Sequence, residues 1–135
     1  MEHVSASNFS QRIVALALSA RGLPKKPAEI TIILISAVCG LSASRNYSEK
    51  ELGAELQRWT LDVGAHFGID HVTLRRYLVD AGLLRRDAAG AQYALQSSAH
   101  QFSFDPEILA LDLHALLSAA RDERAERKRL HQGTA

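Results

Sequence analysis

The sequence predicts a mostly α-helical fold that contains one small β-hairpin. Five segments carry apolar residues at helical spacing, each next to helix start or stop signals, and one glycine-containing turn separates two short runs near residue 90. The chain has 135 residues, of which 47% are hydrophobic and 23% charged. This composition supports one domain with a buried core, with or without a helical arm.

The first helix is expected to begin at Ser7 or Asn8, because either side chain can cap it. Its apolar face consists of Phe9, Ile13, Leu16, Ala17 and Ala20. Gly22 and Pro24 provide the stop signal.

A second helix is expected to begin at Pro27, with Glu29 in its first turn. Residues 30–41 also suit a buried strand, because they include a β-branched run. The start signals favour the helix, and so does one apolar stripe formed by Ile30, Leu34, Ala37, Val38 and Leu41. Cys39 lies in this segment and is expected to be a buried, inert thiol.

A third helix begins at Ser48, which forms a capping-box pattern with Glu51. Its apolar positions are Leu52, Leu56, Trp59, Val63 and Phe67, with a break expected near Thr60. Gly68 supplies a turn, and Asp70 caps a fourth helix that ends at Gly82.

The fourth helix is followed by a predicted hairpin whose turn is Asp87–Gly90, and residues 46–47 are expected to add a third strand. Residues 97–103 are expected to form a loop. A last helix is predicted from Pro106 to Leu130, about 37 Å long at 1.5 Å per residue. Its inward residues are Leu109, Leu113, Leu116, Leu117 and Ala120, and its charged half includes the i, i+4 pair Glu123 and Arg127.

Residues 60–79 match the requirements of a helix-turn-helix. Gly64 is the small residue expected where the two helices cross, and Gly68 is the turn. The apolar residues expected to lock the helix angle are Val63, Phe67, Ile69, Leu74 and Tyr77. Because a hairpin follows, the order is that of a winged helix-turn-helix at 27–98. Residues 1–26 are then an N-terminal helix with a linker, and 99–135 a long helix that is a candidate dimerisation arm.

Helical geometry separates the faces of the fourth helix, at about 100° per residue. Leu74, Tyr77, Leu78 and Ala81 face the core, and Val72, Arg75, Arg76 and Val79 face outward. In a helix-turn-helix the outward face of this helix enters the major groove of double-stranded DNA. The residues expected to contact DNA are His71, Val72, Thr73, Arg75, Arg76, Arg85, Arg86 and Gln92.

The predicted function is therefore that of a DNA-binding transcriptional regulator. A net charge of +1 excludes a strongly basic binder, so the contact depends on a local patch and is more plausible in a homodimer. The alternative is a winged helix that binds another protein through Val72 and Val79 rather than DNA. Adjacent arginines on a helix are also common on solvated faces.

The stretch GIDHVTLRRYLVDAGLLRRDAAGAQY resembles a bacterial family known only as domain of unknown function 2087. The shared patterns lie at Tyr47–Glu51, Asp70–Gly82 and Arg86–Tyr93, which span about the middle half of the chain. Members joined to winged-helix regulators imply a role in transcription control, without assigning chemistry to any residue. The stretch from Arg58 to Ile69 is longer here than in the family.

No other function class has a matching pattern. A single cysteine excludes a disulfide framework and a cysteine-based zinc site, and the six histidines lack metal-ligand spacing. No phosphate loop, paired-carboxylate motif or Ser-His-Asp pattern indicates an enzyme, and no cofactor is expected. Without a signal peptide or an apolar run long enough to cross a bilayer, a cytoplasmic protein is expected, with no membrane partner.

Overall fold

The computed structural model describes residues 2–96 and 99–133. The helices are α1 (Ala6–Ser19), α2 (Pro27–Val38), α3 (Glu49–Leu61), α4 (His71–Ala81), the 3-10 helix η1 (Pro106–Ala110) and α5 (Leu113–Gly133). The strands are β1 (Glu2–Val4), β2 (Asn46–Ser48), β3 (Leu84–Arg86), β4 (Gln92–Leu95) and β5 (Phe102–Phe104). The mostly helical fold with a small antiparallel sheet is confirmed. None of the described helices is both long and apolar enough to cross a membrane.

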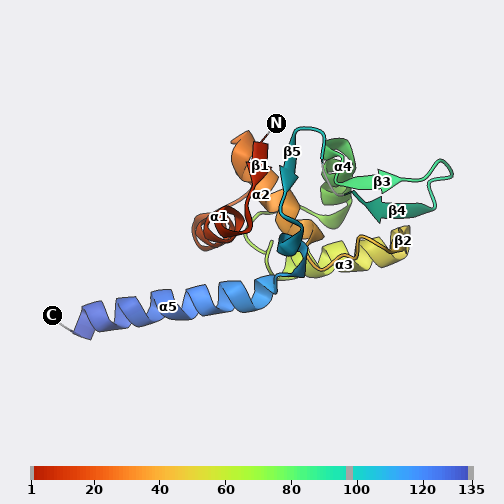
Figure 1. Ribbon diagram of the computed structural model, residues 1–135. Coiled ribbons are helices and arrows are strands. Elements are labelled where there is room, and N and C mark those ends of the chain that lie inside the picture. Colours follow the sequence, from red (N-terminus) through yellow and green to blue (C-terminus); the bar gives the residue numbers. More distant parts are fainter. Residues whose placement is uncertain (1, 97–98, 134–135) are drawn as a thin grey trace.

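The strands form two separate sheets. One is antiparallel with the order β2-β4-β3, so the predicted hairpin and its third strand are confirmed. The other pairs β1 with β5 in parallel and was not predicted. Of the segment expected to be a loop, 97–98 lie outside the described residues and Phe102–Phe104 form a strand. The β3–β4 hairpin and α5 extend in opposite directions from the helical body (Figure 1).

The local signals place most helix ends correctly. Ser48 and Glu51 form the predicted capping box, and α3 ends at Leu61, beside the expected break. Asp70 caps α4, and Gly82 ends it with a φ of +84°. The cap of α1 differs from the prediction: the Ser5 side chain, rather than Ser7 or Asn8, accepts the Asn8 amide hydrogen.

The ambiguous segment forms α2 and lies at the centre of the molecule. Residues 32–38 are all buried, and a helix that is buried on every side has no polar face. Within it the Ser36 hydroxyl accepts a hydrogen bond from Trp59 Nε1 at 3.1 Å and donates one to the Ile33 carbonyl. Cys39 follows α2, half-buried, and burial raises the pKa of its thiol to about 12.

The C-terminal helix is shorter than predicted. Residues 106–110 form η1, Leu111 is extended, and α5 starts at Leu113. Ile108 and Leu113 are both buried, although a continuous helix would turn their side chains about 140° apart. The break therefore buries both residues. Asp112 makes the new start possible, since its carboxylate accepts the Ala115 amide hydrogen at 3.0 Å.

The prediction for Gly64 was also wrong. The residue lies after α3 and under the Trp59 ring, where a Cβ atom would come within 2.4 Å of a ring carbon. Val63 and Phe67 are buried in the same turn, and the Phe67 ring stacks on Trp59 with centroids 6.0 Å apart. The glycine that faces α4 is Gly53, within α3, where an added Cβ would lie 3.9 Å from the His71 ring.

Candidate nucleic-acid interface

Helix α4 begins with a closed network of hydrogen bonds. The Asp70 carboxylate accepts the Thr73 amide hydrogen at 2.8 Å and the Thr73 hydroxyl hydrogen at 3.0 Å. These hydrogen bonds, the backbone one first, lower the pKa of Asp70 below its ordinary value. The negative charge of this carboxylate lies at the positive end of the helix dipole, which is a favourable arrangement. The Thr73 hydroxyl hydrogen already has its acceptor in the protein.

One face of α4 anchors the helix. Leu74 and Leu78 are fully buried, and Tyr77 and Ala81 are half-buried against the same core. The predicted core face is thus confirmed. His71 is half-buried, and its ring lies close to Gly53 of α3. The ring is therefore directed partly toward α3.

The exposed face of α4 is narrower than the sequence indicates. Val72 is 52% exposed, and Arg76 and Asp80 are exposed one and two turns further along. The Arg76 guanidinium lies 5.8 Å from the centre of the Tyr77 ring. Within the described residues Arg76 has no ion-pair partner, so its donors are available to a ligand.

Arg75 has a different environment from its neighbour. Its side chain is 20% exposed, and its guanidinium lies 3.0 Å from a Glu49 carboxylate oxygen at the start of α3. The same guanidinium is 5.8 Å from the centre of the Tyr93 ring on β4. Arg75 therefore joins α4 to α3 and to the sheet, although the sequence placed it on the free outward face.

Val79 is also less exposed than predicted. It is half-buried and packs against the core, in a depression of 360 Å³ between the end of α4 and the sheet. The depression is lined by Val79, Gly82, Leu84, Arg85, Arg86, Gln96 and His100. Val72 is therefore the more exposed of the two valines.

The β3–β4 hairpin carries the remaining predicted residues. Arg85, Arg86 and Gln92 are all exposed, and neither arginine has an ion pair among the described residues. The turn is closed by Asp87, whose carboxylate accepts the Ala91 amide hydrogen at 2.8 Å. At the turn Gly90 adopts a φ of +71°, and a Cβ there would lie 2.6 Å from the Arg86 guanidinium. The guanidinium of Arg86 thus lies over the turn.

The predicted site residues fall into two groups. Exposed residues on α4 and the hairpin are Val72, Arg76, Arg85, Arg86 and Gln92. Half-buried residues with contacts inside the protein are His71, Thr73 and Arg75. The exposed group supplies three arginines without carboxylate partners in the described part of the chain, a pattern that suits contacts with phosphate or base edges.

The structure brings together a Ser-His-Asp group that the sequence does not reveal. His3 on β1 contacts the Ser103 hydroxyl at 2.8 Å through Nδ1 and the Asp105 carboxylate at 2.8 Å through Nε2. Its side chain is 56% exposed. Asp105 directly precedes η1, but its side chain makes no capping hydrogen bond there; its other oxygen accepts the Ala6 amide hydrogen at 2.9 Å, at the start of α1. The group therefore fastens β1 and α1 to β5. Nothing in the spacing of these residues could have indicated it, because β1 and β5 are about a hundred residues apart.

The described residues contain no comparable cluster that could bind a metal ion. Within residues 2–96 and 99–133, no group of three or more His, Cys, Asp or Glu side chains has the arrangement of a metal site.

One family model matches the chain. It covers residues 20–95, more than half of the sequence, and this range contains every element from α2 to β4. Searches of the curated proteins and of the solved structures gave no significant match. The chain therefore belongs to the family described as "Uncharacterized protein conserved in bacteria (DUF2087)".

Proposed function

We propose that this protein is a DNA-binding transcriptional regulator of the winged helix-turn-helix type. In this proposal α2, α3 and α4 are the helical core, α4 is the recognition helix, and the β3–β4 hairpin is the wing. The role is one of binding, without catalysis.

The observation that carries the proposal is the joint exposure of α4 and the hairpin. Arg76, Arg85 and Arg86 are exposed without ion-pair partners in the described residues, and all lie on the two elements that contact DNA in such domains. The order α2-β2-α3-α4-β3-β4, with strands arranged β2-β4-β3, is consistent with the wing assignment. We assign base contacts to Arg76 and Val72, and phosphate contacts to Arg85, Arg86 and Gln92.

Arg75 has a positioning role in this proposal. Its ion pair with Glu49 fixes α4 relative to α3 and leaves Arg76 as the arginine that faces the groove. His71 and Thr73 hold the start of the same helix.

The first test is fluorescence anisotropy of the protein on mixed-sequence duplex DNA at several salt concentrations. Contacts with phosphates predict that log K falls with log salt, with a slope of about −0.9 per phosphate neutralised. A duplex selected from a random pool then serves to compare Arg76→Ala with Arg58→Ala. Arg58 lies on α3, is 71% exposed and pairs with Glu55, so it is the matched control outside α4, the hairpin and α5.

Loss of a base contact from Arg76 should weaken selected-site binding by about 1–3 kcal/mol. The control variant should bind like the unaltered protein. Equal affinity of both variants, or no binding at low salt, would refute the DNA assignment.

A second candidate function is protein binding through the exposed valine. Val72 is 52% exposed and lies in the first turn of α4, on the outward face of that helix. Val72→Asp would then break a complex with a partner protein and leave DNA affinity unchanged. Because Val79 is half-buried, we now place this contact on Val72 alone.

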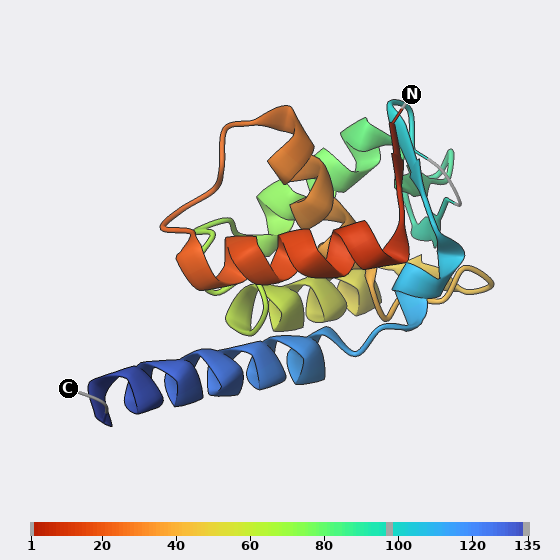
Figure 2. The ribbon, with the colours of Figure 1, turned by 60° about the vertical axis from the view of Figure 1, so that its left-hand side comes forward.

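We also propose that the protein acts as a homodimer, with α5 as the pairing element. Residues 122–133 of α5 are exposed, and Figure 2 shows this part of the helix extending past the end of α1. Leu130 is 59% exposed there. Light scattering on the full chain and on Leu130→Lys tests the proposal: a dimer that the variant dissociates supports it, and a monomer at assay concentrations refutes it.

A further inference from the structure

A second positively charged site lies away from α4 and the hairpin, between the end of α1 and the middle of α5. It is a pocket of 480 Å³, within the size range of small-molecule sites. Its lining comes from three parts of the chain: Ala17, Leu18, Ser19, Ala20, Arg21, His66, Arg121 and Arg124. Figure 2 shows the two helices side by side at this position.

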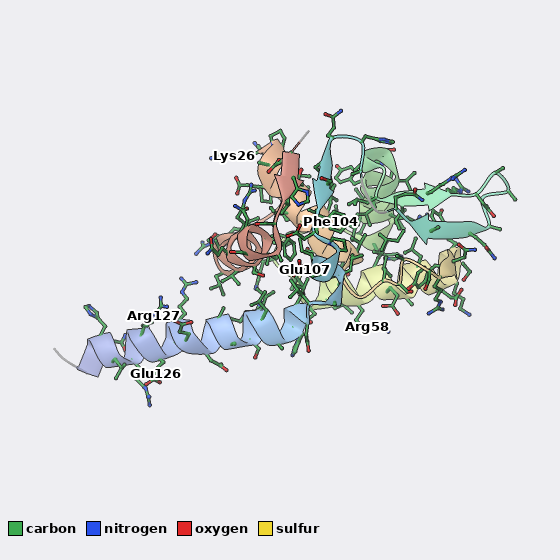
Figure 3. All side chains as sticks on the ribbon, in the orientation of Figure 1. Lys26, Arg58, Phe104, Glu107, Glu126 and Arg127 are labelled. Carbon is green, nitrogen blue, oxygen red and sulfur yellow. The ribbon has the colours of Figure 1, made fainter. Side chains whose placement is uncertain are left out.

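The ionisable side chains that line this pocket are all basic. Its ionisable lining residues are three arginines and a histidine, and no carboxylate lines it. The adjoining depression contains Glu123, which already pairs with Arg127. In Figure 3 Arg127 lies on the side of α5 that faces the body of the protein, and Glu126 on the opposite side. The basic face of α5 is therefore directed toward α1.

The three arginines differ in what holds them. Arg124 donates a hydrogen bond to the Leu18 carbonyl at 3.0 Å. This hydrogen bond gives a partner to a carbonyl group in the last turn of α1, the end of the helix that carries partial negative charge. The side chains of Arg21 and Arg121 have no such partner, because within the described residues neither guanidinium makes a hydrogen bond or an ion pair. Arg121 is also half-buried.

Like charges held close together repel one another unless an anion lies between them. Guanidinium groups present several N–H donors in a plane and match the oxygens of a phosphate group. We propose that this pocket binds the phosphate group of a small phosphorylated molecule, with Arg21 and Arg121 as the principal donors and Arg124 as a third cation.

The pocket is connected to α4 through the turn that contains His66. The Gly22 amide donates a hydrogen bond to the His66 carbonyl at 2.8 Å, and this turn leads directly into Asp70 and α4. An occupant would therefore link α5, the end of α1 and the segment before α4.

The test is titration of the full-length protein with inorganic pyrophosphate, followed by calorimetry and by NMR of the arginine side-chain N–H groups. Ionic strength is held constant with potassium chloride, so that screening is separated from binding. Arg121→Gln and Arg21→Gln each remove one charge and keep a polar side chain. Because Arg21 is exposed, its variant is expected to fold even if the half-buried position does not tolerate the change. Arg129→Gln, on the same helix but outside the pocket, is the control.

The proposal predicts saturable binding that weakens about tenfold or more in either pocket variant and is unchanged in the control. Shifts that do not saturate, or that are equal in all variants, would overturn it. A parallel titration with duplex DNA distinguishes a small phosphorylated ligand from the phosphates of a nucleic acid. If the pocket variants lose DNA affinity and the protein binds no pyrophosphate, the pocket is part of a nucleic-acid surface and the small-ligand proposal is wrong. Because pyrophosphate binding is measured without DNA, its failure is independent of the DNA-binding proposal.

Discussion

The hydrogen bond between Ser36 and Trp59 joins α2 to α3 and gives a quantitative prediction. Ser36 is 1% exposed and Trp59 is 7% exposed, so neither polar group has free access to water. Ser36→Ala leaves the indole N–H buried without an acceptor, which should lower the free energy of unfolding by about 1–3 kcal/mol.

The reasoning is tested by repeating the same substitution in a Trp59→Phe background. The indole N–H is then absent, and Ser36 loses only its bond to the Ile33 carbonyl within α2. Because alanine also has the higher helix propensity, the second Ser36→Ala should change stability by no more than about 0.5 kcal/mol. The coupling energy between the two positions should therefore be about 0.5 kcal/mol or more.

Urea unfolding monitored by far-UV circular dichroism measures all four proteins. Fluorescence is unsuitable, because Trp59 is the only tryptophan and two of the proteins lack it. If Ser36→Ala costs the same in both backgrounds, the hydrogen bond does not contribute to stability and the argument fails.

Three further predictions concern the turn after α3, the strand pair and α4. Gly64→Ala should destabilise the protein strongly, because its Cβ would lie 2.4 Å from a carbon of the Trp59 ring, and thermal unfolding would show a lower midpoint. Hydrogen bonds from the Ala6 amide first and from His3 second lower the pKa of Asp105 in the folded state. Its contribution to stability is therefore present above the ordinary carboxyl pKa and is lost as pH falls through about 4 toward the lowered value. Asp105→Asn should flatten this part of the curve of stability against pH, and an unchanged curve would contradict the assignment. Glu49→Gln should reduce stability by up to about 1 kcal/mol, since Glu49 is 59% exposed and solvent screens its ion pair with Arg75. A double-mutant cycle with Arg75→Ala should show the coupling, and equal costs of Glu49→Gln in the two backgrounds would contradict the ion pair.

The sequence alone determined the elements whose signals lie within a few residues. A capping box or an Asp cap acts on amide groups two or three positions away, so Ser48 and Asp70 could be assigned without knowledge of the rest of the chain. The same holds for Gly82, where a left-handed backbone ends α4, and for the hairpin turn at Asp87–Gly90.

Only the tertiary structure decided which side chains of these elements are exposed and free of partners within the protein. Arg75 and Arg76 are neighbours with the same side chain, yet one pairs with Glu49 and the other is exposed. The partner of Arg75 belongs to another helix, and periodicity carries no information about that contact. The parallel pairing of β1 with β5 and the break before α5 also result from contacts between segments that are distant in the sequence. Both depend on burying side chains from distant segments, such as Phe102, Ile108 and Leu113, in one core, which no local pattern specifies.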